Sequence, residues 1–172
     1  MTRNLMAGLV ALSLFAAPAA FAQKSGDPLQ SVLVARKVIV AEGRESLVEA
    51  TAARPGDVIE YVATYRNAGK NAITGLQANL PIPPQTEFVP GTARPAQVKA
   101  SLDGRSFADI PLKRTVVRDG RRIEEQVPYR EYRALRWIVG ELGGGKSADF
   151  AARVKVIDDG PPVEPVNKAG VK

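Results

Sequence analysis

The feature that most constrains this chain is a two-residue alternation of apolar and polar side chains, broken every eight to twelve residues by turn-forming residues. Residues 57–66, 97–102 and 148–157 alternate in this way, and no segment shows the period of a convincing amphipathic helix. The turn signals are Pro55-Gly56-Asp57, Asn67-Ala68-Gly69, Pro90-Gly91, Asp103-Gly104, Asp119-Gly120 and Gly143-Gly144-Gly145. Short strands at this spacing predict an all-β sandwich or barrel.

The N-terminus has the three parts of a secretory signal peptide. Arg3 supplies the positive charge, the run from Leu5 to Ala17 is uncharged and mostly apolar, and Ala20-Phe21-Ala22 is a small-x-small cleavage pattern. A buried N-terminal helix is the alternative interpretation. We expect cleavage after Ala22, so that the protein is exported and keeps no transmembrane anchor.

Composition divides the rest of the chain into three parts. The expected division is a signal peptide at 1–22, a flexible leader at 23–31, one domain at 32–157 and a disordered proline-rich tail at 158–172.

The chain contains no cysteine and no histidine. An exported protein without cysteine has no disulfide framework, so its fold must rest on a hydrophobic core. Ser-His and Cys-His nucleophile pairs are excluded, as are zinc, copper and haem sites built on these residues. A hydrolase that uses carboxylates alone stays open, although Glu124 and Glu125 are adjacent and would point to opposite faces of a strand. We therefore expect no catalytic, cofactor or metal site.

Four aromatic residues are predicted to form the structural core: Tyr61, Tyr65, Trp137 and Phe150. Tyr61 and Tyr65 share one face of their strand, and Trp137 alternates with apolar neighbours, as a core aromatic of a sandwich does. Residues 32–40 are apolar on both faces. Such a strand is either covered on both sides or lies along the edge of a sheet.

Three groups of motifs follow one another in a fixed order. They are Pro55-Gly56-Asp57 with Ile59-x-Tyr61 and Tyr65-x-Asn67-x-Gly69; Leu80-Pro81-Ile82-Pro83 with Phe88-Val89-Pro90-Gly91-Thr92-Ala93 and Ser101-x-Asp103-Gly104; and Leu135-x-Trp137-x-Val139-Gly140-x-Leu142 with Gly145-x-Ser147. In this order they resemble the conserved-repeat, Ig-like domain of bacterial surface and exported proteins, a family of unknown function, over about residues 33–157. The resemblance implies an Ig-like β-sandwich of about seven or eight strands.

This chain departs from the tandem arrangement of that family, because it holds a single copy and an elaboration at 111–131. Similar single-domain proteins of Gram-negative bacteria place the expected location in the periplasm, with the cell surface or the medium as alternatives.

Positive charge gathers in one segment. Residues 113–136 hold eight cations and four carboxylates, a balance of +4, whereas the whole chain has a formal net charge of +6. The candidate residues for binding an anion or a partner are Arg114, Arg118, Arg121, Arg122, Arg130 and Arg133. They could bind lipopolysaccharide phosphates, cell-wall polymers or an acidic protein, and nucleic acid is not expected after export. Alternatively, the charges pair with one another on a solvated hairpin, with Tyr129 and Tyr132 interleaved.

Two further patterns carry weaker hypotheses. Lys37, with Glu60 on a neighbouring strand, could take part in a Lys–Asn crosslink, but no asparagine is suitably placed, and a lysine at a strand edge is the simpler interpretation. Residues 143–147 resemble a phosphate-binding loop by letters only, since a strand and not a helix follows them. We interpret them as a hairpin turn.

Together these patterns predict an exported, non-enzymatic structural or interaction module of the bacterial cell envelope, with loops and a free strand edge as its contact surfaces. The alternative is a periplasmic binding module for anionic envelope polymers through residues 113–136.

Overall fold

The computed structural model describes residues 28–157, and the expected signal peptide and C-terminal tail lie outside this range. Within it the chain forms eleven strands and one short 3₁₀ helix. The elements are β1 (Leu29–Ala41), β2 (Arg44–Glu49), β3 (Val58–Asn67), β4 (Ile73–Pro81), β5 (Thr86–Phe88), β6 (Lys99–Ser101), β7 (Ala108–Asp109), β8 (Lys113–Arg118), β9 (Arg121–Gln126), η1 (Tyr129–Glu131), β10 (Ala134–Leu142) and β11 (Ser147–Val156). The all-β class is confirmed. The strand count exceeds seven or eight because several strands have only two or three residues.

The larger sheet has five strands in the order β2-β1-β3-β11-β5, and every neighbouring pair is antiparallel. Its core-facing side carries alternate residues of β3 and β11, among them Ile59, Ala63, Phe150 and Val154, which are all buried. The alternation expected for residues 57–66 and 148–157 therefore marks the covered face of this sheet.

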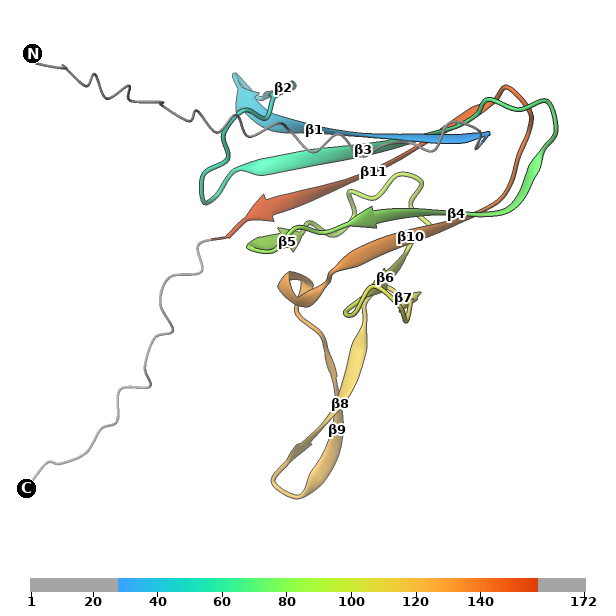
Figure 1. Cartoon of the computed structure of the whole chain (residues 1–172). Helices are drawn as coiled ribbons and strands as arrows, with labels where there is room; N and C mark the ends of the chain where they lie inside the picture. Colours follow the sequence, from blue (N-terminus) through green and yellow to red (C-terminus); the bar gives the residue numbers. More distant parts are fainter. Residues whose placement is uncertain (1–27, 158–172) are drawn as a thin grey trace, which may run out of the picture.

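The smaller sheet has four strands in the order β4-β10-β6-β7. Leu80 and Leu135 face each other across the β4–β10 pair and are fully buried. Trp137 follows on the same face, is 2% exposed, and donates its indole N–H to the carbonyl oxygen of Pro95 at 2.7 Å. The two sheets form the two layers seen in Figure 1, with one continuous apolar core.

The expected aromatic core is partly right. Trp137 and Phe150 are buried with ring centroids 5.4 Å apart, and Tyr65 packs edge-on against Phe150 at 5.9 Å. Tyr61 and Tyr65 themselves are only half-buried, although Ile59 and Ala63 on the same face of β3 are buried.

Two boundaries differ from the sequence-based expectation. β1 begins at Leu29, inside the segment expected to be a flexible leader, because its first residues pair with the far end of β3. Residues 143–146 join β10 to β11, which belong to different sheets, so this segment is a crossover and not a hairpin turn. A Cβ atom on Gly144 would overlap the carbonyl oxygen of Lys70, which explains the glycine there.

The remaining two strands, β8 and β9, form a separate antiparallel hairpin that projects from the smaller sheet (Figure 1). We call residues 113–126 the arm. Its turn is Asp119-Gly120, and both residues have positive φ, 52° and 73°. This is the backbone of a two-residue turn that matches the twist of the strands, so the hairpin predicted at this dipeptide is present.

Candidate interaction site on the projecting arm

The arm rises from a fixed base in the core. Leu112 and Val127 directly flank its strands, and both are buried. The backbone N–H of Val127 donates to the carbonyl of Leu112 at 2.8 Å, and the N–H of Leu112 donates to the hydroxyl of Tyr132 at 2.7 Å. An ion pair between Arg114 and Glu131, 2.8 Å long, also ties β8 to η1. An isolated two-stranded hairpin is marginally stable in water, so these contacts set the arm's position.

Tyr132 was expected among the charged surface residues, and this interpretation is wrong. Its side chain is fully buried and stacks on Phe88 with centroids 6.2 Å apart, while Tyr129 packs edge-on against both rings. Burial raises the pKa of the Tyr132 hydroxyl. The two tyrosines therefore form a second aromatic cluster beneath the arm, and they do not serve as its binding surface.

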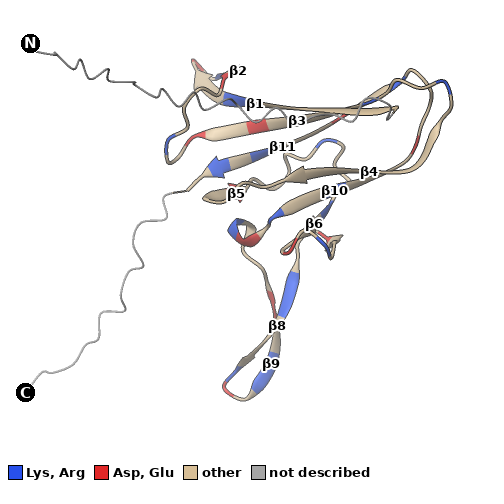
Figure 2. Cartoon of the chain, viewed as in Figure 1, with Lys and Arg blue, Asp and Glu red and all other residues tan. Residues whose placement is uncertain are grey.

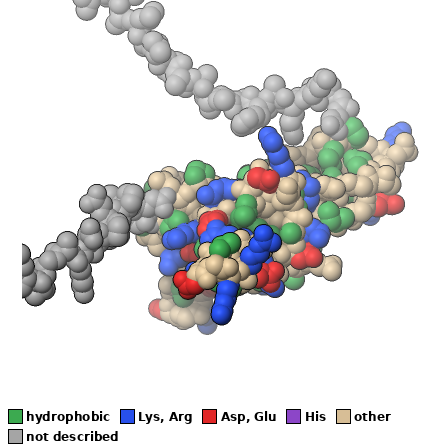
Figure 3. Space-filling view, turned by 90° about the horizontal axis from the view of Figure 1, so that it is seen from below, with side chains coloured by type: hydrophobic (Ala, Val, Ile, Leu, Met, Phe, Trp, Pro, Cys, Tyr) green, Lys and Arg blue, Asp and Glu red, His purple; other side chains and the backbone are tan. Residues whose placement is uncertain are grey.

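Alternation assigns the side chains of the arm to two faces. One face carries Arg114, Val116, Arg118, Arg121, Ile123 and Glu125, and the other carries Lys113, Thr115, Val117, Arg122, Glu124 and Gln126. Figure 2 shows Lys and Arg on both strands and Asp and Glu on β9 and at the turn, and Figure 3 shows the intermixed charges and apolar side chains at this end of the molecule.

Two of the three carboxylates of the arm form ion pairs near its base, and the third, Asp119, lies in the turn at its tip. Glu124 binds Lys113 at 2.8 Å on one face, and Glu125 binds Arg114 at 2.9 Å on the other. Arg118 lies 3.6 Å from the second oxygen of Glu125. The two glutamates therefore lie apart, as expected from their adjacent positions, and the pairing alternative is correct for the lower part of the arm.

The tip of the arm is different. Among the described residues no carboxylate pairs with Arg121 or Arg122, which stand at the start of β9. Arg118 sits directly opposite Arg121, so two guanidinium groups share one face at the turn. Beside them, Val117 is 70% exposed opposite Arg122. The exposed valine gave no signal in the sequence, because alternation does not tell which face of a hairpin is covered.

Three further cations of residues 113–136 lie apart from the tip, and two of them, Arg130 and Arg133, are among the six candidates. Arg130 is on η1 and makes no ion pair with the described residues, whereas Arg133 donates to the carbonyls of Arg130 and Tyr132 at 2.8 and 3.1 Å. Arg136 donates to the side chain of Asn79 at 2.8 Å and lies 3.6 Å above the ring of Phe107. The six candidates therefore do not form one binding patch, and the tip holds Arg118, Arg121 and Arg122.

Lys37 does not meet the partner considered for it. Its ammonium group lies 2.7 Å from Asp57, which also accepts a backbone hydrogen bond from Arg54 at 2.8 Å. The hydrogen bond from Lys37 lowers the pKa of the Asp57 carboxyl group most, and the backbone bond lowers it further. Lys37 is opposite Ile59 on the core-facing side of the sheet, so Glu60, one residue later, points to the other side.

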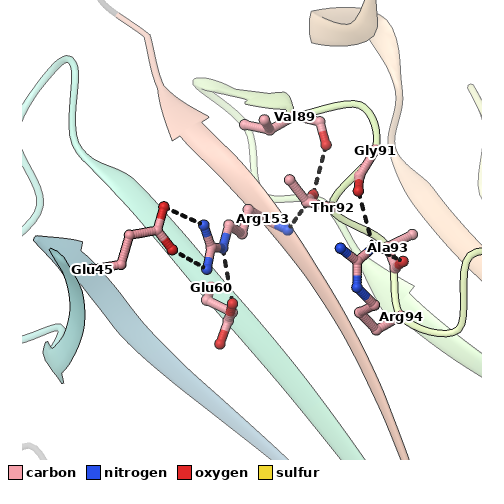
Figure 4. A network of polar contacts seen from close by, with 8 residues as sticks. All are labelled: Glu45, Glu60, Val89, Gly91, Thr92, Ala93, Arg94 and Arg153. Atoms are coloured by element: carbon pink, nitrogen blue, oxygen red, sulfur yellow. Dashed lines mark hydrogen bonds and ion pairs between the residues drawn. The ribbon is translucent and has the colours of Figure 1, made fainter. Parts of the chain in front are cut away.

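Glu60 instead belongs to a polar network on the outer side of the larger sheet (Figure 4). Arg153 of β11 binds Glu60 of β3 at 2.9 Å and both carboxylate oxygens of Glu45 of β2 at 2.9 and 3.1 Å. The same contact lowers the pKa of Glu45 and raises that of Arg153. The backbone N–H of Arg153 donates to Thr92 at 3.0 Å. One residue thus connects three strands and a loop, an arrangement the sequence did not reveal.

The Asp103-Gly104 turn holds a strongly perturbed carboxyl group. Asp103 accepts hydrogen bonds from the backbone N–H groups of Arg105 and Ser106, each 2.8 Å long, and from the hydroxyl of Ser101. These bonds lower its pKa from 3.8 to about 2. The stabilisation is therefore complete above about pH 4 and is lost as the pH falls towards about 2.

We expect Asp103→Asn to be less stable than the wild-type protein at neutral pH, because the charged acceptor is lost. The difference in unfolding midpoint should shrink as the pH falls from about 4 to about 2, where the wild-type carboxyl group is protonated too. Urea unfolding at a series of pH values measures it. Asp119→Asn, at the other Asp-Gly turn, is the matched control, because the side chain of Asp119 makes none of the hydrogen bonds that hold Asp103, and its loss of stability at neutral pH should be smaller. A difference between Asp103→Asn and the wild-type protein that stays constant down to about pH 2 would contradict the assignment.

Comparison with protein-family models, curated proteins and solved structures finds no match to this chain. Among residues 28–157, no helix is long and apolar enough to cross a membrane.

Proposed function

We propose that this protein is an exported, non-enzymatic interaction module of the bacterial cell envelope that binds an acidic partner protein through the tip of its arm. The observation that carries this proposal is the tip itself, where Arg121 and Arg122 have no carboxylate partner among residues 28–157 and Val117 is 70% exposed. Arginine next to exposed apolar area is typical of protein interfaces, whose core is apolar and whose anchoring residues include arginine.

The base of the arm supports the same role. Because Leu112, Val127 and Tyr132 are buried and hydrogen-bonded to one another, the tip is presented at a fixed distance from the sandwich. A pre-positioned contact surface loses less conformational entropy on binding than a flexible loop does. The ion pairs near the base occupy the carboxylates there, which leaves the excess positive charge of the arm at its tip.

A photo-crosslinking amino acid at position 117 tests this proposal in cells. The expected result is one discrete adduct with an envelope protein, identified by mass spectrometry. Position 138 is the matched control, since Ile138 is 60% exposed but lies on β10, away from the arm. Equal adducts from both positions, or no adduct from position 117, would contradict the proposal.

Charge reversal tests which residues carry the binding. Arg121→Glu with Arg122→Glu should abolish the adduct, whereas Arg66→Glu with Lys70→Glu, the same change in net charge on the sandwich, should leave it intact. If both double variants lose it equally, net charge and not the arm is responsible.

The unpaired guanidinium groups also favour a second candidate, binding of an anionic envelope polymer. Purified lipopolysaccharide is the probe. If lipopolysaccharide binds through charge alone, its affinity should fall steeply as the salt concentration rises from about 0.05 to about 0.5 M. If Val117 also makes an apolar contact, binding should persist at the higher salt concentration.

A further inference from the structure

Within residues 28–157, the part of β1 from residue 30 to residue 35 has a neighbouring strand on one side only. β3 pairs with β1 from Leu29 to Val38, whereas β2 pairs only with residues 36–41. Residues 30–35 therefore form an open edge of the larger sheet within the described part of the chain. In Figure 1, β2 lies beside one end of β1.

The turn between β1 and β2 determines which backbone groups point out of this edge. Glu42 and Gly43 have positive φ, 53° and 74°, so they form a two-residue turn closed by the pair Ala41 and Arg44. Such a turn closes on a hydrogen-bonded pair, and in an antiparallel ladder these pairs alternate. The odd-numbered residues of β1 therefore direct N–H and C=O towards β2, and Ser31, Leu33 and Ala35 direct theirs beyond its end.

The side chains at this edge are apolar and exposed. Val32 is 59% exposed, Leu33 49% and Val34 39%, and Val32 and Val34 lie on the opposite face from Leu33. Residues 30–35 include no charge and no proline. Native edge strands usually carry lysine, proline or a bulge that prevents pairing, and residues 30–35 have none of them.

We infer that residues 30–35 pair antiparallel with the same segment of a second copy of this chain, so that two five-stranded sheets join into one. The segment is self-complementary. In the register that places Val32 beside its counterpart, Leu33 forms a hydrogen-bonded pair with Ser31 of the second copy. Only uncharged side chains meet, so no like charges oppose each other. Glu49, which already pairs with Arg36, limits the length of the new ladder.

The interface is small, because three exposed aliphatic side chains and the outward backbone groups of six residues account for most of it. An interface below about 1,200 Å² is typical of weak or transient association, so we expect a dimer that dissociates in the micromolar range. This inference does not depend on the arm, which projects from the other sheet.

Single-cysteine variants test it directly, because the natural chain has no cysteine. Val32 beside its counterpart is a non-hydrogen-bonded pair, whose Cα separation of about 4.5 Å suits a disulfide. In the protein as recovered from expression, oxidation by copper phenanthroline should crosslink Val32→Cys at least tenfold faster than Ile138→Cys, which has the same exposure on β10. Equal rates would overturn the inference, since both would then reflect random collision.

Sedimentation provides the second measurement. The wild-type protein should show a concentration-dependent monomer–dimer equilibrium. Val32→Lys should weaken it at least tenfold, because two ammonium groups would face each other, and Ile138→Lys should leave it unchanged. A wild-type protein that stays monomeric at several hundred micromolar, or a dimer unaffected by Val32→Lys, would overturn the inference. A partner strand of another protein at this edge would show as a Val32-dependent heteromeric adduct without the homodimer.

Discussion

Replacement of Trp137 by alanine is expected to lower the free energy of unfolding by about 3–5 kcal/mol, the usual range for deleting a buried tryptophan. Trp137 is 2% exposed and lies between the two sheets against Phe150. Its removal would leave a cavity and a carbonyl of Pro95 that no longer receives the indole hydrogen bond. Urea unfolding followed by far-ultraviolet circular dichroism measures the loss.

Trp137→Phe is the control for this prediction. Phenylalanine keeps most of the ring volume and removes the indole N–H, so the expected loss is near 1 to 2 kcal/mol. If both variants unfold at the same urea concentration as the wild-type protein, Trp137 does not hold the sheets together, and the sandwich described above would be wrong.

Tyr132→Phe is expected to lower the free energy of unfolding by about 1–3 kcal/mol, although it removes a single oxygen atom. That oxygen accepts the backbone N–H of Leu112 in a buried environment, and phenylalanine would leave the donor without a partner. Because Leu112 is at the base of the arm, amide hydrogen exchange in residues 113–126 should also become faster than in the sandwich strands.

Tyr65→Phe is the matched variant, because the Tyr65 hydroxyl also bonds to backbone groups, those of Asn79, but at an exposed position. Water can replace that oxygen, so the loss should be well below that of Tyr132→Phe. Equal losses, or unchanged exchange in the arm of Tyr132→Phe, would contradict the anchoring role assigned to Tyr132.

The sequence predicts the strands of this fold well, because alternation and turn chemistry are local. Residues 57–66 and 148–157 correspond closely to β3 and β11, and Asp119-Gly120 forms the turn between β8 and β9. Trp137 and Phe150 were recognised as core residues from the same alternation.

What the sequence did not predict depends on contacts between distant segments. The residue types at 143–146 are typical of a hairpin turn, and they do not indicate whether the next strand joins the same sheet or crosses to the other one. The arginines around Tyr132 in the sequence indicate a surface residue. It is buried because Phe88 and Leu112, which are distant in the sequence, pack against it.

The candidate site was predicted only in part, for a similar reason. Spacing located the positive segment, but pairing with Glu124, Glu125 and Glu131 is a matter of three-dimensional register. The unpaired guanidinium groups at the tip become visible only after those pairs are assigned. Residues 32–40, apolar on both faces, were expected either to be covered on both sides or to lie along an edge. Residues 30–35 lie along an edge within the described part of the chain, whereas residues 36–41 pair with β2 and are still not covered on both faces, since Val40 is 68% exposed.

The Arg153 network has a consequence for the accessible length of β1. β2 is attached to the sandwich by its hydrogen-bonded ladder with β1 and by the bidentate ion pair between Arg153 and Glu45. Weakening this ion pair, by salt or by loss of either side chain, favours the dissociation of β2 from β1. The stretch of β1 without a neighbouring strand would then grow from residues 30–35 towards Ala41 and roughly double in length. The ion pair of one guanidinium group therefore limits how much of this strand edge is accessible to another molecule.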